Sequence, residues 1–188
     1  APFVAPIQAP RASYVGDAAT MTVRETSAEI HPHLPPVPVW GYGRGTRPAQ
    51  SPGALLEVSA GRPCSIQWRN ELATQALPFL TSVVTGDDPD DSVQNHVGSG
   101  TGSPADLAAA PVGWLVTHVH GGHVGPESDG WPDHMVAPGG VQRCHYTNDD
   151  DNAELGLAKV GASLWYHDHA MDATRLHVMA GLFGGYLV

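Results

Sequence analysis

Short stretches in which apolar and polar residues alternate run through most of this sequence, and they constrain its fold more than any other feature. Such alternation places successive side chains on opposite faces of a β-strand. Glycine and proline separate the stretches, and helical periodicity is almost absent. We therefore predict an all-β fold, either a sandwich or a barrel. The predicted strands span residues 20–25, 54–59, 64–69, 114–120, 141–146, 163–169 and 184–188.

One short helix is predicted near the C-terminus, over residues 171–179. Met171, Arg175 and Met179 recur there at helical spacing, and Gly181 is placed to end the helix. A length of 188 residues favours one domain. Residues 1–18, rich in proline and alanine, indicate an extended N-terminal arm before a single domain over 19–188. Within it, 85–113 are acidic and then glycine-rich, which predicts a flexible insertion.

Composition excludes several classes of function. The net charge of −10 repels phosphate backbones, so we expect no nucleic-acid partner. No run approaches the ~18 consecutive apolar residues of a membrane span. The first residues lack a charged region followed by an apolar run, so no signal peptide is predicted. The compartment is left open, because the sequence has only two cysteines and Cys64 alternates with Ile66 like a buried free thiol.

Two His-x-His pairs dominate the chemistry-bearing residues. His118 and His120 end one predicted strand, and His167 and His169 end another. Within each pair the two residues share a face of the strand and lie roughly 6.5 Å apart. Two such strand ends placed side by side would bring four imidazoles to one spot.

A ligand set of imidazoles alone favours zinc, copper, nickel or iron over calcium and magnesium. It also leaves coordination positions open, which is typical of a catalytic site. At this level a zinc-dependent hydrolase that uses three of the histidines and an activated water is one possibility. A copper-binding module without catalytic activity is another.

Longer motifs surround these histidines. They are Thr117-His-Val-His-Gly-Gly122, Ser128-Asp-Gly130, Leu164-Trp-Tyr-His-Asp-His-Ala-Met171, Thr174-Arg-Leu176 and Gly185-Tyr-Leu-Val188, with weaker motifs at His33-Leu-Pro-Pro36 and Val39-Trp-Gly-Tyr42. In these motifs the sequence resembles the first cupredoxin domain of multicopper oxidases, and within that family the branch of spore-coat laccase, bilirubin oxidase and phenoxazinone synthase. The resemblance implies a cupredoxin-like Greek-key β-sandwich or barrel with one short helix, and it spans nearly the whole chain apart from 85–113.

The resemblance also implies roles for individual residues. In the family, eight imidazoles hold a cluster of three coppers that reduces O2 to water. His118 matches a ligand of the type 2 copper, and His120, His167 and His169 match ligands of the paired type 3 coppers. Asp129 matches a carboxylate near the cluster that relays protons or orients a bound water.

Parts of the family pattern are missing from this sequence. The type 1 copper needs a His-Cys-His stretch, but Cys64 is followed by Ser-Ile and Cys144 has a histidine on one side only. Two further His-x-His pairs are also missing. We therefore expect a subunit or segment of a laccase-like oxidase. A second polypeptide would carry the type 1 copper and the remaining ligands, and the partners would be O2 and a small reducing substrate whose identity the sequence does not give.

The other histidines are interpreted as loop, surface or packing residues. His123 follows the first pair but lacks the neighbouring aspartate of a zinc-hydrolase pattern. We expect the same of His31, His33, His96, His134, His145 and His177.

Overall fold

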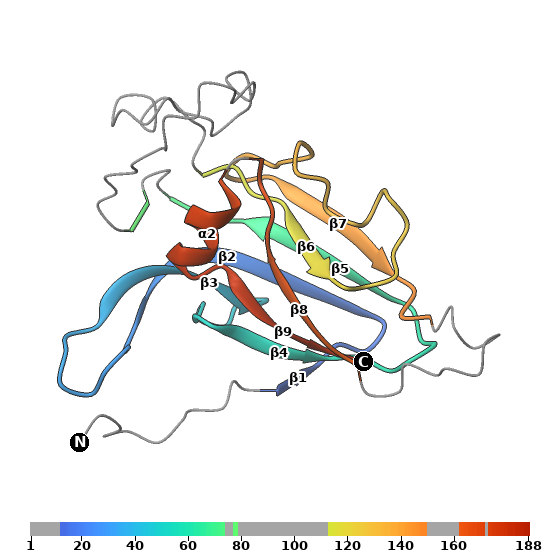
Figure 1. The fold of residues 1–188 in the computed structure, drawn as a ribbon, viewed down its shortest axis with the longest axis horizontal. Helices are drawn as coiled ribbons and strands as arrows, with labels where there is room; N and C mark the ends of the chain where they lie inside the picture. The colour runs from blue at the N-terminus through green and yellow to red at the C-terminus, as the bar shows by residue number, and fades with distance from the viewer. Residues whose placement is uncertain (1–11, 74–76, 79–112, 150–161, 172) are drawn as a thin grey trace, which may run out of the picture.

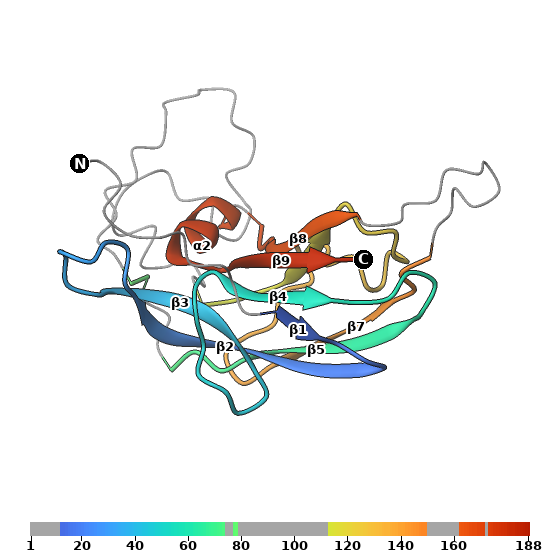
Figure 2. The same ribbon diagram turned by 90° about the horizontal axis from the view of Figure 1, so that it is seen from below.

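Two β-sheets packed face to face form the protein, as seen in a computed structural model that describes residues 12–73, 77–78, 113–149, 162–171 and 173–188. Figures 1 and 2 show the two layers, with the short helix α2 (Thr174–Ala180) at one end of the sandwich. None of the described helical segments is long and apolar enough to cross a membrane. The described strands are β1 (Ala12–Tyr14), β2 (Ala18–Ala28), β3 (Val37–Arg44), β4 (Gly53–Glu57), β5 (Cys64–Asn70), β6 (Thr117–His120), β7 (Val141–Tyr146), β8 (Ser163–Asp168) and β9 (Phe183–Leu187).

The strands are ordered β1-β4-β9-β8-β6 in the five-stranded sheet and β3-β2-β5-β7 in the four-stranded sheet. Both sheets mix parallel and antiparallel neighbours. In the five-stranded sheet β1, β4 and β9 run parallel, whereas β6, β8 and β9 alternate in direction. In the four-stranded sheet β2 is parallel to β5 and antiparallel to β3. Strand β5 shows why this sequence folds as a sandwich, because its residues alternate strictly between buried and exposed. Strand β6 lies at the edge of the five-stranded sheet.

Aromatic side chains fill much of the space between the sheets. Tyr42 and Trp68 from the four-stranded sheet meet Tyr166 of the other sheet, with ring centroids 5.0–5.6 Å apart. Each buried hydroxyl finds a partner: Tyr166 donates to the carbonyl of Ala54 at 2.8 Å, and Tyr42 lies 3.3 Å from the hydroxyl of Thr117. Burial raises the pKa of both tyrosines above the ordinary value, so the phenols stay neutral.

The structure confirms the all-β sandwich and the short C-terminal helix. The two cysteines are free and buried in the core, as expected for Cys64. Strand β7 has the predicted bounds, whereas β6 begins at Thr117 rather than at residue 114. Strand β8 ends at Asp168, one residue earlier than predicted.

Two strands were not predicted. Strand β1 lies inside the stretch interpreted as an arm, where residues 12–14 pair in parallel with β4. Strand β3 was missed because Trp40–Gly43 are all buried and show no alternation. A β-carbon at Gly41 would also contact the backbone of Gln50, so this stretch needs the glycine that lowers its strand propensity. Residues 1–11 and 85–112 lie outside the described residues, and the division into arm, domain and insertion stays a prediction.

Helix α2 begins at Thr174, three residues later than predicted, and ends at Ala180, directly before the glycine that was predicted to end it. Gly181 follows its last residue with a φ of 117°, a left-handed conformation that favours glycine. A β-carbon at this position would collide with the carbonyl oxygen of Trp40 and come within 2.6 Å of the hydroxyl of Ser51. The turn therefore brings the end of α2 against β3.

We expect Gly181→Ala to lower the free energy of unfolding by about 2–4 kcal/mol, because it combines backbone strain with a steric clash. Gly61→Ala is the matched control, since Gly61 also has a positive φ of 67° but has no neighbouring atom within 4 Å of its added β-carbon. That change should cost about 1–2 kcal/mol. Urea denaturation measures both, and equal losses would contradict the packing described here.

Candidate metal centre

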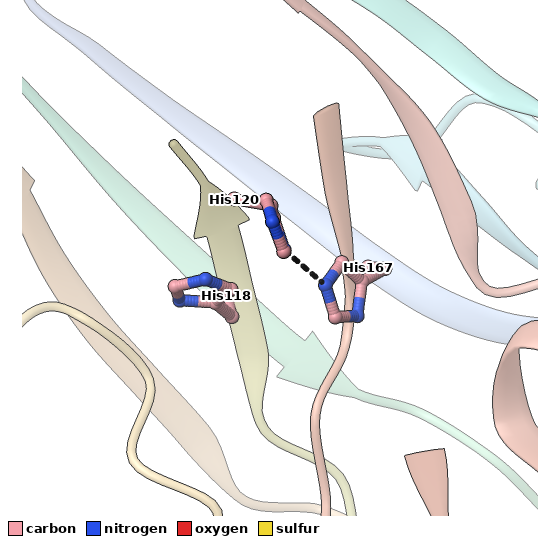
Figure 3. A group of neighbouring side chains, drawn as sticks. All are labelled: His118, His120 and His167. Atoms are coloured by element: carbon pink, nitrogen blue, oxygen red, sulfur yellow. Dashed lines mark hydrogen bonds between the residues drawn. The ribbon is translucent and has the colours of Figure 1, made fainter. Parts of the chain in front are cut away.

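The pairing of β6 with β8 places the histidine pairs on one surface. In the antiparallel register His118 lies opposite His167, and His120 lies opposite Trp165. Their neighbours in sequence, Val119 and Tyr166, point into the core and are almost completely buried. The imidazoles therefore project from the outer face of the five-stranded sheet, as Figure 3 shows for three of them.

The four predicted ligands form one cluster. Ring centroids are 5.5 Å apart for His118 and His120, 5.5 Å for His118 and His167, and 5.2 Å for His118 and His169. His169 is 5.4 Å from His167, and Nδ1 of His120 is 3.4 Å from Nε2 of His167. The expectation that the two strand ends lie side by side and bring the four imidazoles together is confirmed.

Three of these side chains place a nitrogen within 4.8 Å of one another, namely His118, His120 and His167. Two nitrogens that are each ~2.0–2.1 Å from the same ion can be separated by at most about 4.2 Å. The 3.4 Å between Nδ1 of His120 and Nε2 of His167 lies within this limit. No other group of three histidine, cysteine or acidic side chains comes this close among the described residues.

Hydrogen bonds fix which nitrogen three of the imidazoles present. Nδ1 of His118 donates to the carbonyl of Asp129 at 2.5 Å, and Nδ1 of His167 donates to the carbonyl of Asp168 at 2.7 Å. Nδ1 of His169 lies 3.3 Å from the hydroxyl of Thr174, which itself donates to a main-chain carbonyl. In these three rings Nε2 therefore carries the lone pair that a metal requires.

The surroundings also favour uncharged imidazoles. Burial lowers the pKa of His167 and of His169 below the ordinary value, and the neighbouring histidines lower it further. A histidine binds metal in its neutral form, so these shifts suit a ligand. His167 is buried, His118 and His169 are partly buried, and His120 is exposed.

Asp129 reaches the cluster chiefly through its backbone. Its carbonyl accepts the hydrogen bond from His118, and its carboxylate Oδ1 lies farther away, 3.4 Å from the same Nδ1. The side chain is 42% exposed. The following residue, Gly130, has a φ of 81° and packs against the backbone of Thr117, which holds this turn beside β6. The structure thus places Asp129 next to the cluster, and its catalytic role stays a prediction.

Three residues near the cluster were not predicted as part of it. Trp165 stacks on His167 with ring centroids 4.1 Å apart, and the alternation of β8 already put it on the same face. Thr174 supports His169 from α2. Asp168 is completely buried, and an acid at an inward-facing strand position was the signal that could have marked it.

The remaining histidines stay apart from the four-ring cluster where they are described. His145 lies on β7 beside Ser65, in the other sheet. His123 lines a separate small pocket of about 40 Å³ together with Val119, Tyr146 and Tyr186. His177 was predicted to be a packing residue, and it is completely buried and bonded to Asp168 at 2.6 Å. His96 lies outside the described residues.

No protein-family model matches the sequence. The laccase of Bacillus subtilis is 30% identical over 169 residues, which are 89% of this chain and 28% of that protein. The laccase of Haloferax volcanii is 31% identical over 173 residues, 92% of this chain and 27% of that protein. The chain therefore spans a little over a quarter of the length of these relatives.

Solved structures agree on the fold. A variant of the McoA multicopper oxidase from Aquifex aeolicus matches 96% of this chain with 29% of its own, at a TM-score of 0.63 and 16% identity. A multicopper oxidase from Pediococcus acidilactici matches 97% of this chain with 29% of its own, at a TM-score of 0.61 and 18% identity. The chain is thus homologous to laccases over a little more than a quarter of their length, and its fold is that of one cupredoxin-like domain of a multicopper oxidase.

Proposed function

We propose that this chain supplies half of the histidine ligands of a trinuclear copper cluster in a laccase-like oxidase. The oxidase would couple one-electron oxidation of a small substrate to four-electron reduction of O2 to water. The observation that supports this most strongly is the cluster of four imidazoles on one face, three of them with Nδ1 hydrogen-bonded or close to a polar oxygen and with the lone pair on Nε2. Copper, when bound, supplies the redox chemistry.

The resemblance to multicopper oxidases supplies the roles within the site. His118 would bind the type 2 copper, and His120, His167 and His169 would bind the paired type 3 coppers. The bond to the Asp129 carbonyl orients the His118 ring. The Asp129 carboxylate is partly exposed and lies near this ring, so its Oδ1 is placed to exchange protons between solvent and the site.

Four imidazoles do not complete the family's set of eight, so the other ligands and the type 1 copper would come from outside these 188 residues. The exposure of the site supports this. His120 is exposed, and Trp165 on the same face is 39% exposed. His120 lies on β6, the edge strand of the five-stranded sheet, and Trp165 lies opposite it on the adjacent strand β8, so this face is open to a partner. We propose a second polypeptide or a further domain that covers this face.

The two described cysteines do not suit the type 1 site. Cys64 and Cys144 lie in the core between the sheets, 2% and 3% exposed. Burial raises the pKa of Cys144, which disfavours the thiolate that binds copper. This supports a type 1 copper held by the partner.

Metal content and ligand replacement test this function together. We expect the assembled oxidase to contain copper, to be intensely coloured and to consume O2. Replacing His120 or His167 with alanine should weaken Cu²⁺ binding by this chain more than about 100-fold, because even residues that only support a ligand contribute 10–100-fold. Isothermal titration measures the affinity, and His145→Ala is the control because this exposed histidine lies in the other sheet.

Three results would contradict the proposal. Zinc in place of copper, without colour, would favour a hydrolase. One or two coppers and no O2 consumption with any partner would favour a copper-binding module. Equal Cu²⁺ affinity in His145→Ala and His120→Ala would place the metal elsewhere.

Asp129 gives a separate test of proton transfer. We expect Asp129→Asn to keep the copper content of the assembled oxidase, because His118 bonds to the main-chain carbonyl of this residue. O2 consumption should fall about 10–100-fold. An oxygen electrode measures the rate, and Asp133→Asn, at a nearby exposed position, is the matched control. Unchanged O2 consumption would show that this carboxylate has no part in proton transfer.

A further inference from the structure

Asp168 separates the two histidines of the second pair, and its carboxylate is buried at 0% exposure. Oδ2 accepts a hydrogen bond from the backbone N–H of Val116 at 3.0 Å. Oδ1 accepts one from the N–H of Ala170 at 3.0 Å and one from Nδ1 of His177 at 2.6 Å. One side chain thus receives three donors from three different segments.

Each of these segments either adjoins a histidine of the cluster in sequence or contacts one. Val116 comes two residues before His118, and Ala170 directly follows His169. His177 belongs to α2, the helix whose Thr174 supports the ring of His169.

His169 depends on this arrangement more than the other three histidines. It lies just beyond the end of β8, where the regular ladder with β6 has stopped. Its own N–H donates to the carbonyl of Val116 at 2.8 Å, so its backbone is held by the same residue that Asp168 holds. His118, His120 and His167 lie within paired strands.

A carboxylate suits this position better than a neutral side chain. Three N–H groups meet in a place without solvent, and an acceptor with two oxygens satisfies all of them. An asparagine would turn an NH₂ group toward one of these donors and leave that donor unpaired. A buried charge is tolerated only when it is bonded in this way.

We propose that Asp168 is a positioning residue, which holds His169 in place for metal binding by tying the start of β6, the turn after β8 and helix α2 to one buried carboxylate. This inference rests on the proposed function, in which the four histidines bind copper. It concerns this chain's own geometry, so copper affinity rather than oxidase activity is its readout.

The test is Cu²⁺ titration of the full chain with variants of Asp168. Asp168→Asn should weaken binding by about 10–100-fold. The same change in a His169→Ala background should have little further effect, whereas in a His120→Ala background it should keep its effect. Such non-additivity is expected only if Asp168 acts through His169.

Variants of His177 provide a second measurement in case Asp168→Asn fails to fold. His177→Leu removes the donor from α2 and should weaken Cu²⁺ binding, whereas His177→Asn can place an amide N–H near the position of Nδ1 and should restore it. Tyr186→Phe is the control for lost stability, because it removes a partly buried 2.6 Å hydrogen bond to Asn148 away from the cluster. It should leave Cu²⁺ affinity unchanged.

Some results would contradict only the role of Asp168, and one would also contradict the proposed function. Equal losses from Asp168→Asn in the His169→Ala and His120→Ala backgrounds would overturn the inference, as would His177→Leu and His177→Asn binding Cu²⁺ equally well. A wild-type chain whose histidines bind no Cu²⁺ would overturn the proposed function and this inference together.

Discussion

The antiparallel register of β6 against β8 is the constraint on which the candidate metal centre depends. Side chains alternate along both strands, so a slip of one residue in either strand would exchange its core face and its outer face. His118 and His167 would then no longer meet. Val119 and Tyr166 oppose such a slip, because both are buried and Tyr166 also bonds to the carbonyl of Ala54. The apolar core thus determines where the imidazoles lie.

The core also connects the metal centre to the opposite sheet. Tyr42 of β3 reaches across the sandwich to the hydroxyl of Thr117, the residue before His118. Gln142 of β7 exchanges two hydrogen bonds with the backbone of the same Thr117, at 2.7 and 2.8 Å. Edge strands are prone to fraying and to wrong pairing. These contacts from the other layer hold β6 at the edge while leaving its outer face free.

The local sequence pattern predicted the four candidate ligands and the strand face that they share. It predicted only some of the contacts that hold these ligands in place. Alternation with period two was enough to put His118 with His120, and His167 with His169, because it depends on neighbours in sequence. Strand β3 escaped prediction because its Trp40–Gly43 stretch is buried on both sides. The contact between Asp168 and Val116 escaped prediction because 52 residues separate the two, and a contact at that distance is decided by the tertiary fold. Polar residues that support a site from inside the core are therefore the hardest to find from sequence.

Asp129 and Asp168, the two acids beside the imidazoles, have different roles in a metal centre whose ligands are neutral. Metal ions held by imidazoles alone keep their full positive charge, and nearby carboxylates offset it. Asp129 is 42% exposed, so it can exchange protons with solvent as well as contribute charge. Asp168 is 0% exposed, and its carboxylate accepts hydrogen bonds from three donors within the protein. It can therefore contribute negative charge and hold neighbouring segments in place, but it has no contact with solvent. Proton transfer in the proposed oxidase would therefore involve Asp129, and the geometry of its ligands would depend on Asp168.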